Sequence, residues 1–401
     1  MISVRLRESG GWQERELTGA QAAMLAASKL VHIQLSPRPG VWRLRAGDRV
    51  GVARVGLARA TPDRPAIELR IEPKLSINRL FFLLGYAAKP RGWRQEEVDA
   101  GEHKELLPAL AHAFARAADR ALRRGVLLGY RETEEALPVV RGRIRISEQV
   151  RRRYGMPLPV EVRYDDYTSD IAENRLLLAA TRKLLRLPGV GTPTRRLLRH
   201  SLIRLDGVAP LVAGLPLPEW TPGRLNTRYH TALGLADLVL RDASYELDGG
   251  SEVRVDGLML EMWRVFEDFL TTALAEELRR YGGMTRLQDK RHHLDRLRRV
   301  QIKPDLVHYA QPEIPTAVVD AKYKAKGTHE ADLYQMLAYC TVLGLRTGHL
   351  VYADGAGGPV VHEITGTGGS RIVETALDLS LSPDRLLAQL GRLAAEIHGS
   401  S

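Results

Sequence analysis

The residue types best suited to catalysis gather in the segment AVVDAKYKAKG, residues 317–327. Side chains two apart on a strand point to the same face, so Asp320 and Lys322 share a face, about 6.6 Å apart along the strand. Lys324 has the same face but lies about 13 Å from Asp320. The spacing therefore selects Lys322 as the lysine that acts with Asp320. The alternative interpretation is a half-buried strand that ends in a solvated run of charge.

A second carboxylate, Asp305, lies upstream in the segment IKPDLV. Residues 310–316, AQPEIPT, favour a hairpin connection, which would return Asp320 beside Asp305. Two converging carboxylates can hold Mg²⁺, and this ion neutralises a phosphodiester and makes a water nucleophilic. Two carboxylates with Lys322 on the same face favour a site for phosphodiester hydrolysis. The alternative interpretation is that the two carboxylates lie at strand ends and pair with arginine.

The helices expected on either side carry polar residues that suit the same site. In residues 258–274 apolar side chains recur at helical spacing, and Glu267 borders this stripe, where it can reach the edge of a sheet. Gln335 and Tyr339 are four residues apart and share a helix face, from which they would orient the lysine or a DNA phosphate. The alternatives are a surface ion pair for Glu267 and ordinary helix packing for Gln335 and Tyr339.

These motifs resemble those of a known nuclease superfamily. Pro304–Asp305 followed by Asp320–Ala321–Lys322 is similar to the PD-(D/E)XK signature, and Glu267 with the Gln335 and Tyr339 pair resembles its RecB-like branch. More specifically, most of the chain resembles the McrC family, the nuclease subunits of McrBC-type modification-dependent (5-methylcytosine) restriction systems. The supporting stretches are IEPKLSINRLFFLLGYA (71–87), LPVVRGRI (137–144), DIAENRLLLAAT (170–181) and MWRVFEDFL (262–270).

The resemblance implies a Mg²⁺-dependent endonuclease that cleaves double-stranded, methylated DNA in phage defence. It also implies an AAA+ GTPase partner of the McrB type, into whose ring the N-terminal half docks and whose GTP hydrolysis it stimulates. The residues implied as catalytic are Asp305, Asp320, Lys322 and Glu267, the three acidic ones being metal ligands, with Gln335 and Tyr339 in support.

A strongly basic segment, VRGRIRISEQVRRRYG, covers residues 140–155. If the segment is a strand, Arg141 and Arg143 share one face. Contact with DNA and contact with the partner's ring both fit these arginines, and the resemblance favours the partner. The alternative is a solvated hairpin.

Composition narrows the class of protein. The 401 residues carry a formal net charge of +11, which favours an anionic partner such as nucleic acid. The single cysteine, Cys340, allows no disulfide within the chain and no cysteine-based zinc site, in keeping with a reducing cytoplasm. Residues 80–88, the longest apolar stretch, are too few to span a bilayer, so we expect no membrane association. No G-x-x-x-x-G-K-[ST] motif is present, so nucleotide hydrolysis is assigned to the partner.

The periodicity predicts an α+β multidomain fold. Residues 1–75 read as a β-rich subdomain, a small barrel or sandwich with strands at 31–35, 41–47, 50–56 and 66–73. Residues 76–245 read as a helical region, with helices at 104–125, 170–187, 194–205 and 227–242, and the resemblance implies that this region docks the AAA+ partner. Residues 137–170 form an extended basic excursion within it, and Asp170 with Glu173 has the spacing of a helix capping box.

Residues 250–395 are expected to form the α/β PD-(D/E)XK domain, in which helices flank a central mixed sheet. A linker at 247–252 precedes a helix at 257–281, strands at 286–294, 300–309 and 317–324, a helix at 330–343 and strands at 349–353 and 360–364. Two rival functions stay open. One is a self-sufficient RecB-like repair nuclease without a GTPase, and the other is a basic DNA-binding adaptor that uses a nuclease-like fold without catalysis.

Overall fold

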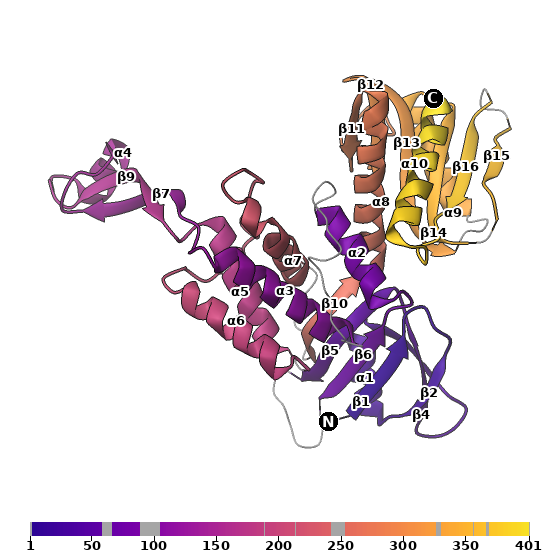
Figure 1. Cartoon of the computed structure of the whole chain (residues 1–401), viewed down its shortest axis with the longest axis horizontal. Coiled ribbons are helices and arrows are strands. Elements are labelled where there is room, and N and C mark those ends of the chain that lie inside the picture. The colour runs from indigo at the N-terminus through magenta and orange to yellow at the C-terminus, as the bar shows by residue number, and fades with distance from the viewer. Residues whose placement is uncertain are drawn as a thin grey trace. The chain divides into compact units, whose positions relative to one another are not determined.

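The computed structural model describes residues 2–57, 66–88, 105–187, 189–212, 214–241, 253–325, 330–355, 357–365 and 369–400. The chain divides into two compact units (Figure 1). The first unit combines Met1–Leu106 with Tyr245–Ser401, and the second is Leu107–Ser244. The linker expected at 247–252 lies outside the described residues. No helix among the described residues is long and apolar enough to cross a membrane.

The N-terminal part of the first unit contains two sheets, as its alternating apolar residues predict. The four expected strands are present as β3 (Val31–Leu35), β4 (Val41–Ala46), β5 (Arg49–Leu57) and β6 (Ile67–Glu72). One sheet has the order β2-β4-β3, with β2 at Gln13–Glu16, and the other has the order β1-β6-β5-β10, with β1 at Ile2–Arg7. The sequence analysis missed β1, β2 and the helix α1 (Gly19–Ala27), which begins with a Thr18–Gln21 capping box.

The fourth strand of that sheet, β10 (Val253–Glu261), corrects the prediction of a helix from residue 257. It pairs antiparallel with β5 along nine residues. The helix α8 (Met262–Leu278) begins only where this pairing ends. There Arg49 pairs with Glu261 at 2.9 Å, and the Met262 amide donates to the Asp48 carbonyl. A partner strand about 200 residues away in sequence thus overrides the local helical pattern.

The C-terminal part of the first unit has a six-stranded mixed sheet with the order β11-β12-β13-β14-β16-β15. Strands β11 to β13 are antiparallel neighbours, β13, β14 and β16 are parallel, and β15 is antiparallel to β16. The sequence analysis predicted a mixed sheet, and this is confirmed. The strands are β11 (Met284–Leu287), β12 (Leu306–Gln311), β13 (Ile314–Ala325), β14 (Thr347–Asp354), β15 (Val360–Glu363) and β16 (Arg371–Ala376).

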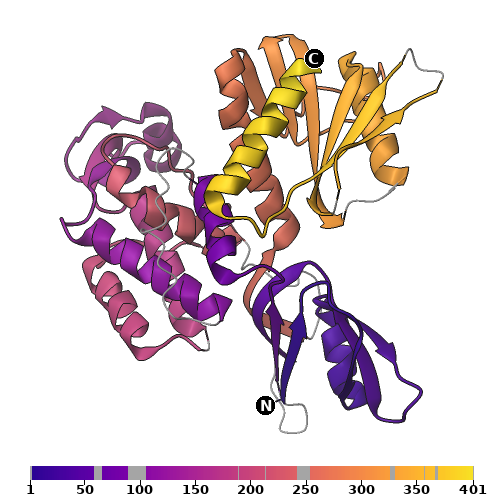
Figure 2. The ribbon, with the colours of Figure 1, turned by 45° about the vertical axis from the view of Figure 1, so that its right-hand side comes forward.

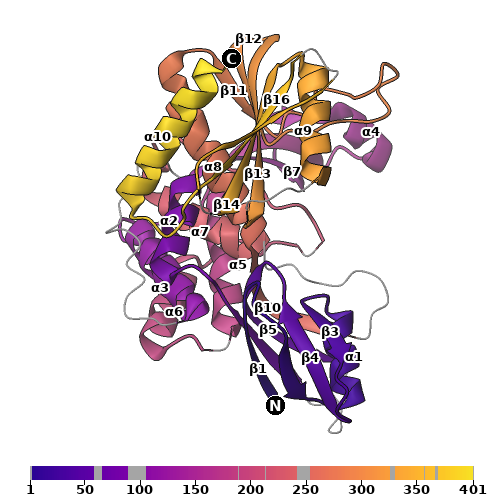
Figure 3. The same ribbon diagram turned by 90° about the vertical axis from the view of Figure 1, so that its right-hand side faces the viewer.

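Helices cover both faces of this sheet (Figure 3). The helix α9 (Glu330–Leu343) connects the parallel strands β13 and β14 and packs on one face around a core that includes Val318, Met336 and Leu350. The helix α10 (Pro383–Gly399) lies on the other face against α8, and Figure 2 shows it in yellow along the strands. The helix α2 (Ile77–Ala88) also packs on α8, where Phe82 meets Phe269 edge to face.

Three details of this part differ from the expectation. The strands predicted at 286–294 and 300–309 are shorter, because the chain leaves the sheet between Leu287 and Leu306. Strand β16 and helix α10 were not predicted at all.

The second unit is helical with a small three-stranded sheet. Its helices are α3 (Leu106–Leu122), α5 (Ala172–Arg186), α6 (Thr192–Arg204) and α7 (His230–Arg241), preceded by a 3-10 turn η2 (Thr227–Tyr229). The sheet has the order β7-β9-β8, from β7 (Gly129–Leu137), β8 (Arg143–Ile144) and β9 (Val160–Thr168). The excursion at 137–170 is therefore not wholly extended, because the helix α4 (Ile146–Arg153) lies within it.

The predicted capping box at Asp170 is wrong. The helix α5 has Ile171 as its N-cap, with no side-chain cap. The carboxylate of Asp170 is instead paired with Arg131 and with Arg175, the latter at 2.6 Å, and it accepts the Ala209 amide at 2.9 Å. These hydrogen bonds, first of all the one from Arg175, lower the pKa of Asp170 to about 2. These charged partners bind the Asp170 carboxylate in place of the helix N-terminal amide that a capping box would use.

Candidate active site

The two predicted carboxylates lie side by side where β12 begins. Strands β12 and β13 pair antiparallel with Leu306 opposite Val319, and their turn places Gln311 opposite Ile314. This confirms the expected hairpin. Asp305 directly precedes β12, and its Oδ2 accepts the Ala321 amide at 2.8 Å. The backbone next to Asp320 therefore fixes the position of the Asp305 carboxylate.

Lys322 shares the face of Asp320, as the strand period predicts. Its Nζ lies 2.5 Å from Oδ2 of Asp320 and donates to Oε1 of Gln335 at 2.8 Å. The next residue, Tyr323, points to the opposite face, where its hydroxyl donates to Glu8 at 2.6 Å. Asp320 is 3 % exposed, so this ion pair lies in a mostly dry environment.

Burial and neighbouring charges both oppose ionisation of the two carboxyls. Burial first, and then the charges of Asp320 and Glu267, raise the pKa of Asp305 to about 8. Burial also raises the pKa of Asp320, against the lowering effect of the Lys322 ammonium. For Lys322 burial acts to lower the pKa, but the neighbouring acidic groups outweigh it and the pKa is raised. Lys322 thus stays cationic while the two carboxyls resist ionising together.

Glu267 reaches the site from α8, as its place beside the apolar stripe indicated. It is 9 % exposed, and its Oε1 accepts a hydrogen bond from Nε2 of Gln288 at 2.6 Å. The Gln288 amide in turn donates to the Asp305 carbonyl at 2.9 Å. Gln288 was not predicted as a site residue, because the strand expected at 286–294 runs through it. The backbone of Gln288 in fact adopts a φ of 47°, which ends the strand.

The helix α9 contributes three residues from one face. Gln335 holds Lys322, and the Tyr339 hydroxyl donates to the Lys303 carbonyl at 3.3 Å. The third residue, Asp332, was missed. Its Oδ2 lies 2.7 Å from Nζ of Lys324, and its Oδ1 lies 3.8 Å from Nζ of Lys322. The three-residue spacing between Asp332 and Gln335 was the available signal.

The donor set at this site suits a hard divalent cation. Asp320 is buried and Asp305 is half-buried, and burial is the first cause of the raised pKa of each, so a cation between the two carboxyls would favour their ionised forms. No group of three or more His, Cys, Asp or Glu side chains is gathered to hold a metal ion within the part of the chain that the structure describes. The site as folded therefore offers two carboxylates and the Ala321 backbone, while Glu267 is engaged by Gln288.

Comparison with known proteins decides the family. Residues 44–353 match the family of McrBC 5-methylcytosine restriction system components. The chain belongs to this family. The matched region includes Asp305, Asp320, Lys322, Gln335 and Tyr339, and it ends before β16 and α10. No curated protein matches the chain.

A solved structure with bound McrC contains a chain of the same fold. The refined half-complex of Thermococcus gammatolerans McrB AAA+ hexamers with bound McrC contains a chain that is 18% identical. The alignment covers 99% of this chain and 100% of that one, with a TM-score of 0.57. The cryo-EM structure of the T. gammatolerans McrBC complex contains a chain 19% identical, with 69% and 88% covered and a TM-score of 0.39.

In this McrBC-family chain a contact between the two parts of the first unit reaches β13, the strand that carries Asp320 and Lys322. Glu8, at the end of β1, is buried and accepts the Tyr323 hydroxyl at 2.6 Å and the Lys74 amide at 2.9 Å. Burial raises the pKa of Glu8. Because Tyr323 follows Lys322, the N-terminal sheet helps to hold the strand that carries the lysine.

In the second unit, Gly142 prevents Arg141 and Arg143 from sharing one face of a strand. This glycine has a φ of 71°, and a side chain there would clash with β9, so the strand pattern that would place both arginines on one face is broken. The Arg141 guanidinium stacks over the Tyr164 ring at 3.9 Å and pairs with Asp166 at 3.0 Å. Arg143 lies in β8 and is exposed.

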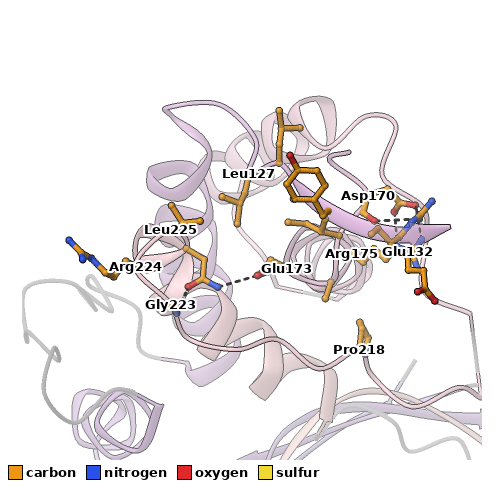
Figure 4. A pocket seen from close by; sticks show the side chains of 16 residues that line it. Leu127, Glu132, Asp170, Glu173, Arg175, Pro218, Gly223, Arg224 and Leu225 are labelled. Carbon is orange, nitrogen blue, oxygen red and sulfur yellow. Dashed lines mark hydrogen bonds and ion pairs between the residues drawn. The ribbon is translucent and has the colours of Figure 1, made fainter. Parts of the chain in front are cut away.

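The second unit also contains a hollow of about 730 Å³ between β7 and the start of α5 (Figure 4). Its charged side chains are largely engaged with one another, since Arg131 and Arg175 both pair with Asp170. Asn226 donates to Glu173 at 3.1 Å on the opposite wall. The hollow lies in a different unit from the carboxylate site.

Proposed function

We propose that this chain is the nuclease subunit of a GTP-driven, modification-dependent restriction complex in the cytoplasm. It cleaves double-stranded DNA with Mg²⁺, and it stimulates the GTPase of an AAA+ partner of the McrB type. The observation that carries the nuclease assignment is the buried Asp320 beside the half-buried Asp305, with Lys322 in contact with Asp320. A binding protein for a polyanion gains nothing from two adjacent carboxylates, whereas a hydrolase needs them.

The fold around the pair supports a PD-(D/E)XK assignment. Asp305 directly precedes β12 and Asp320 lies in β13, and these adjacent antiparallel strands belong to a mixed sheet with α8 and α9 on its two faces. Glu267 comes from α8, and Gln335 and Tyr339 come from α9. This arrangement brings all the residues of the motif to one end of the β12–β13 hairpin.

The roles of the residues follow from their contacts. Mg²⁺, when bound, supplies neutralisation of the phosphate charge and a water of lowered pKa. Asp305 and Asp320 would hold it, with the Ala321 carbonyl and Glu267 as further oxygen ligands. Lys322 is fixed by Gln335 at 2.8 Å and keeps its positive charge, so it orients the attacking water and offsets charge that develops in the transition state.

The partner assignment rests on the second unit. The similar T. gammatolerans chain is described as McrC bound to McrB AAA+ hexamers. In the present chain the region of the sheet β7-β9-β8 and α4 exposes apolar side chains, namely Val139, Val140, Ile144, Ile146, Tyr154 and Met156. Exposed apolar residues interspersed with arginines are typical of a protein interface. We propose that this arm, including Arg141 and Arg143, docks into the partner's ring.

A paired assay tests both halves of the proposal. Cleavage of methylated DNA and GTP turnover are measured on the same mixtures of chain and cognate AAA+ partner. Asp320→Asn and Lys322→Ala should each reduce cleavage by about 100-fold or more and leave stimulation of GTP turnover intact. Arg141→Ala combined with Arg143→Ala should weaken stimulation. The matched control is Glu313→Gln, whose side chain is 86% exposed and which should change neither activity.

Each rival function predicts a different result. Cleavage by the chain alone, unaffected by GTP and partner, would identify a self-sufficient repair nuclease. Wild-type cleavage by Asp320→Asn would exclude the site. DNA binding with no cleavage under any condition would leave a non-enzymatic adaptor. GTP turnover that does not change across a titration to saturation would refute the docking role.

A further inference from the structure

The connection between β11 and β12 is a folded ribbon. The Leu294 amide donates to the Val300 carbonyl at 2.8 Å, and the Ile302 amide donates to the His292 carbonyl at 3.0 Å. At the turn, Asp295 accepts the amides of Arg299 and Val300, both at 2.8 Å. These backbone bonds lower the pKa of Asp295. Residues 290–303, called here the basic ribbon, are therefore ordered by their own hydrogen bonds.

The base of the ribbon is anchored in the protein interior. The Tyr309 hydroxyl donates to Oδ2 of the buried Asp289 at 2.8 Å, and Nε2 of His292 lies 2.8 Å from the same hydroxyl. Arg291 pairs with Asp289 at 2.8 Å. Ile302 joins the core beneath α9. A rigid ribbon loses little conformational entropy when it binds a ligand.

The charge of the ribbon is concentrated and mostly unpaired. Residues 290–303 contain six Lys or Arg and one Asp, a formal net charge of +5. Five of these cations are exposed and form no ion pair with an acidic side chain among the described residues. They are Lys290, Arg296, Arg298, Arg299 and Lys303. By contrast, the exposed arginines at the end of α8, Arg279 and Arg280, are paired with Glu276 and Glu277.

Both ends of the ribbon lie at the carboxylate site. On one side Gln288 bonds Glu267 and the Asp305 backbone. On the other, the Lys303 carbonyl accepts the Tyr339 hydroxyl, one residue before Pro304 and two before Asp305. A polyanion that approaches two carboxylates is repelled unless cations nearby attract it. The ribbon carries such cations from its two ends, at Lys290 and Lys303, to its turn, at Arg296, Arg298 and Arg299.

We propose that the basic ribbon is the surface that holds double-stranded DNA by its phosphates beside the carboxylate site. The inference rests on the proposed nuclease function and names the surface that binds its substrate. A protein partner is the competing occupant, since the tip also exposes Leu297 at 70%. The unpaired cations and their place beside the carboxylates favour DNA, because a neutral or basic protein surface would not need them.

The test measures binding of the full-length chain to a labelled duplex of about 30 base pairs in EDTA, by fluorescence anisotropy. The variant is Arg296→Gln combined with Arg299→Gln, which leaves Arg298, with its φ of 56°, untouched. The matched control is Arg385→Gln combined with Arg392→Gln on α10, which covers the other face of the sheet. Each phosphate contact contributes about 8-fold in affinity at 0.1 M salt.

Loss of two contacts should therefore weaken binding by about 10- to 60-fold and reduce the slope of log affinity against log salt by about 1.8. The control should bind within about twofold of the wild type. Unchanged affinity and slope, or a wild type without salt-dependent binding, would overturn the proposal. So would a variant that binds DNA normally but no longer stimulates the partner's GTPase, because the ribbon would then be a protein interface.

Asp320→Asn separates this inference from the nuclease assignment. It should bind the duplex at least as tightly as the wild type and fail to cleave it. If Asp320→Asn is inactive while the ribbon variant binds normally, the ribbon proposal fails and the nuclease assignment stands. If the ribbon variant loses binding while Asp320→Asn still cleaves, the ribbon holds DNA but the catalytic site lies elsewhere.

Discussion

Replacing Asp305 by Asn tests the cost of ionising this half-buried carboxyl beside Asp320 without changing the size of the side chain. In the metal-free protein the pKa of Asp305 is raised from 3.8 to about 8, first by burial and then by the charges of Asp320 and Glu267. A carboxyl whose pKa is higher in the folded than in the unfolded state stabilises the fold at low pH. That stability is lost as the pH rises from about 4 to about 8.

The size of the effect follows from the pKa difference. At 1.36 kcal/mol for each tenfold change in proton affinity, the rise from 3.8 to about 8 sets a ceiling of about 6 kcal/mol. Relaxation and water entry around the ionised group reduce this cost. We therefore expect Asp305→Asn to raise the free energy of unfolding by about 1 to 3 kcal/mol near pH 8.5. Asn keeps an oxygen for the Ala321 amide, which donates to Asp305 at 2.8 Å.

The assay is equilibrium urea unfolding in EDTA, followed by circular dichroism between about pH 4.5 and about pH 8.5. The advantage of Asp305→Asn should grow with pH, and Mg²⁺ should stabilise the wild type more than the variant. The control is Asp295→Asn. Hydrogen bonds from backbone amides lower the pKa of Asp295, so this change should reduce stability at neutral pH. An Asp305→Asn advantage that does not grow with pH would refute the reasoning.

Three further predictions concern the contacts around the site and in the second unit. Asp332→Asn should lower the rate constant for cleavage by about 10- to 100-fold with little change in substrate affinity or melting temperature, because Lys322 loses a neighbour that positions its charge; single-turnover kinetics measure this. Tyr323→Phe leaves the buried Glu8 without its hydroxyl donor and should cost about 1 to 3 kcal/mol in urea unfolding. Asp170→Asn should destabilise the protein at pH 7 by about 1 to 2 kcal/mol, and thermal melts should show the difference vanishing as the pH falls from about 4 to about 2, because the pKa of Asp170 is lowered to about 2.

Local geometry explains which parts of the site were predictable. Alternation along a strand is a property of the backbone, so the shared face of Asp320 and Lys322 follows from a spacing of two. The hairpin that returns Asp320 to Asp305 follows from a short polar connection between two apolar runs. Gln335 and Tyr339 follow from the helix repeat. Each of these inferences needs only residues that are near in sequence.

Long-range contacts determined the parts of the fold and of the site that local sequence patterns did not predict. Residues 253–261 became a strand because β5 offered an unpaired edge, and α8 begins only where that pairing stops. Asp170 does not cap α5, because in the folded chain its carboxylate binds Arg131 from β7 and the Ala209 amide. Neither partner can be read from the local pattern.

The sequence by itself determined the chemical groups of the candidate site, their shared face and the strand and helix that carry them, because these depend on local backbone periods. Only the tertiary structure decided how those groups ionise and what holds them. The raised pKa of Asp305 comes from burial and from carboxylates on another strand and helix. Gln288 and Asp332 became part of the site because pairing of distant strands and packing of α9 brought them to it. Burial and charge proximity are properties of the packed chain, and no sequence spacing encodes them.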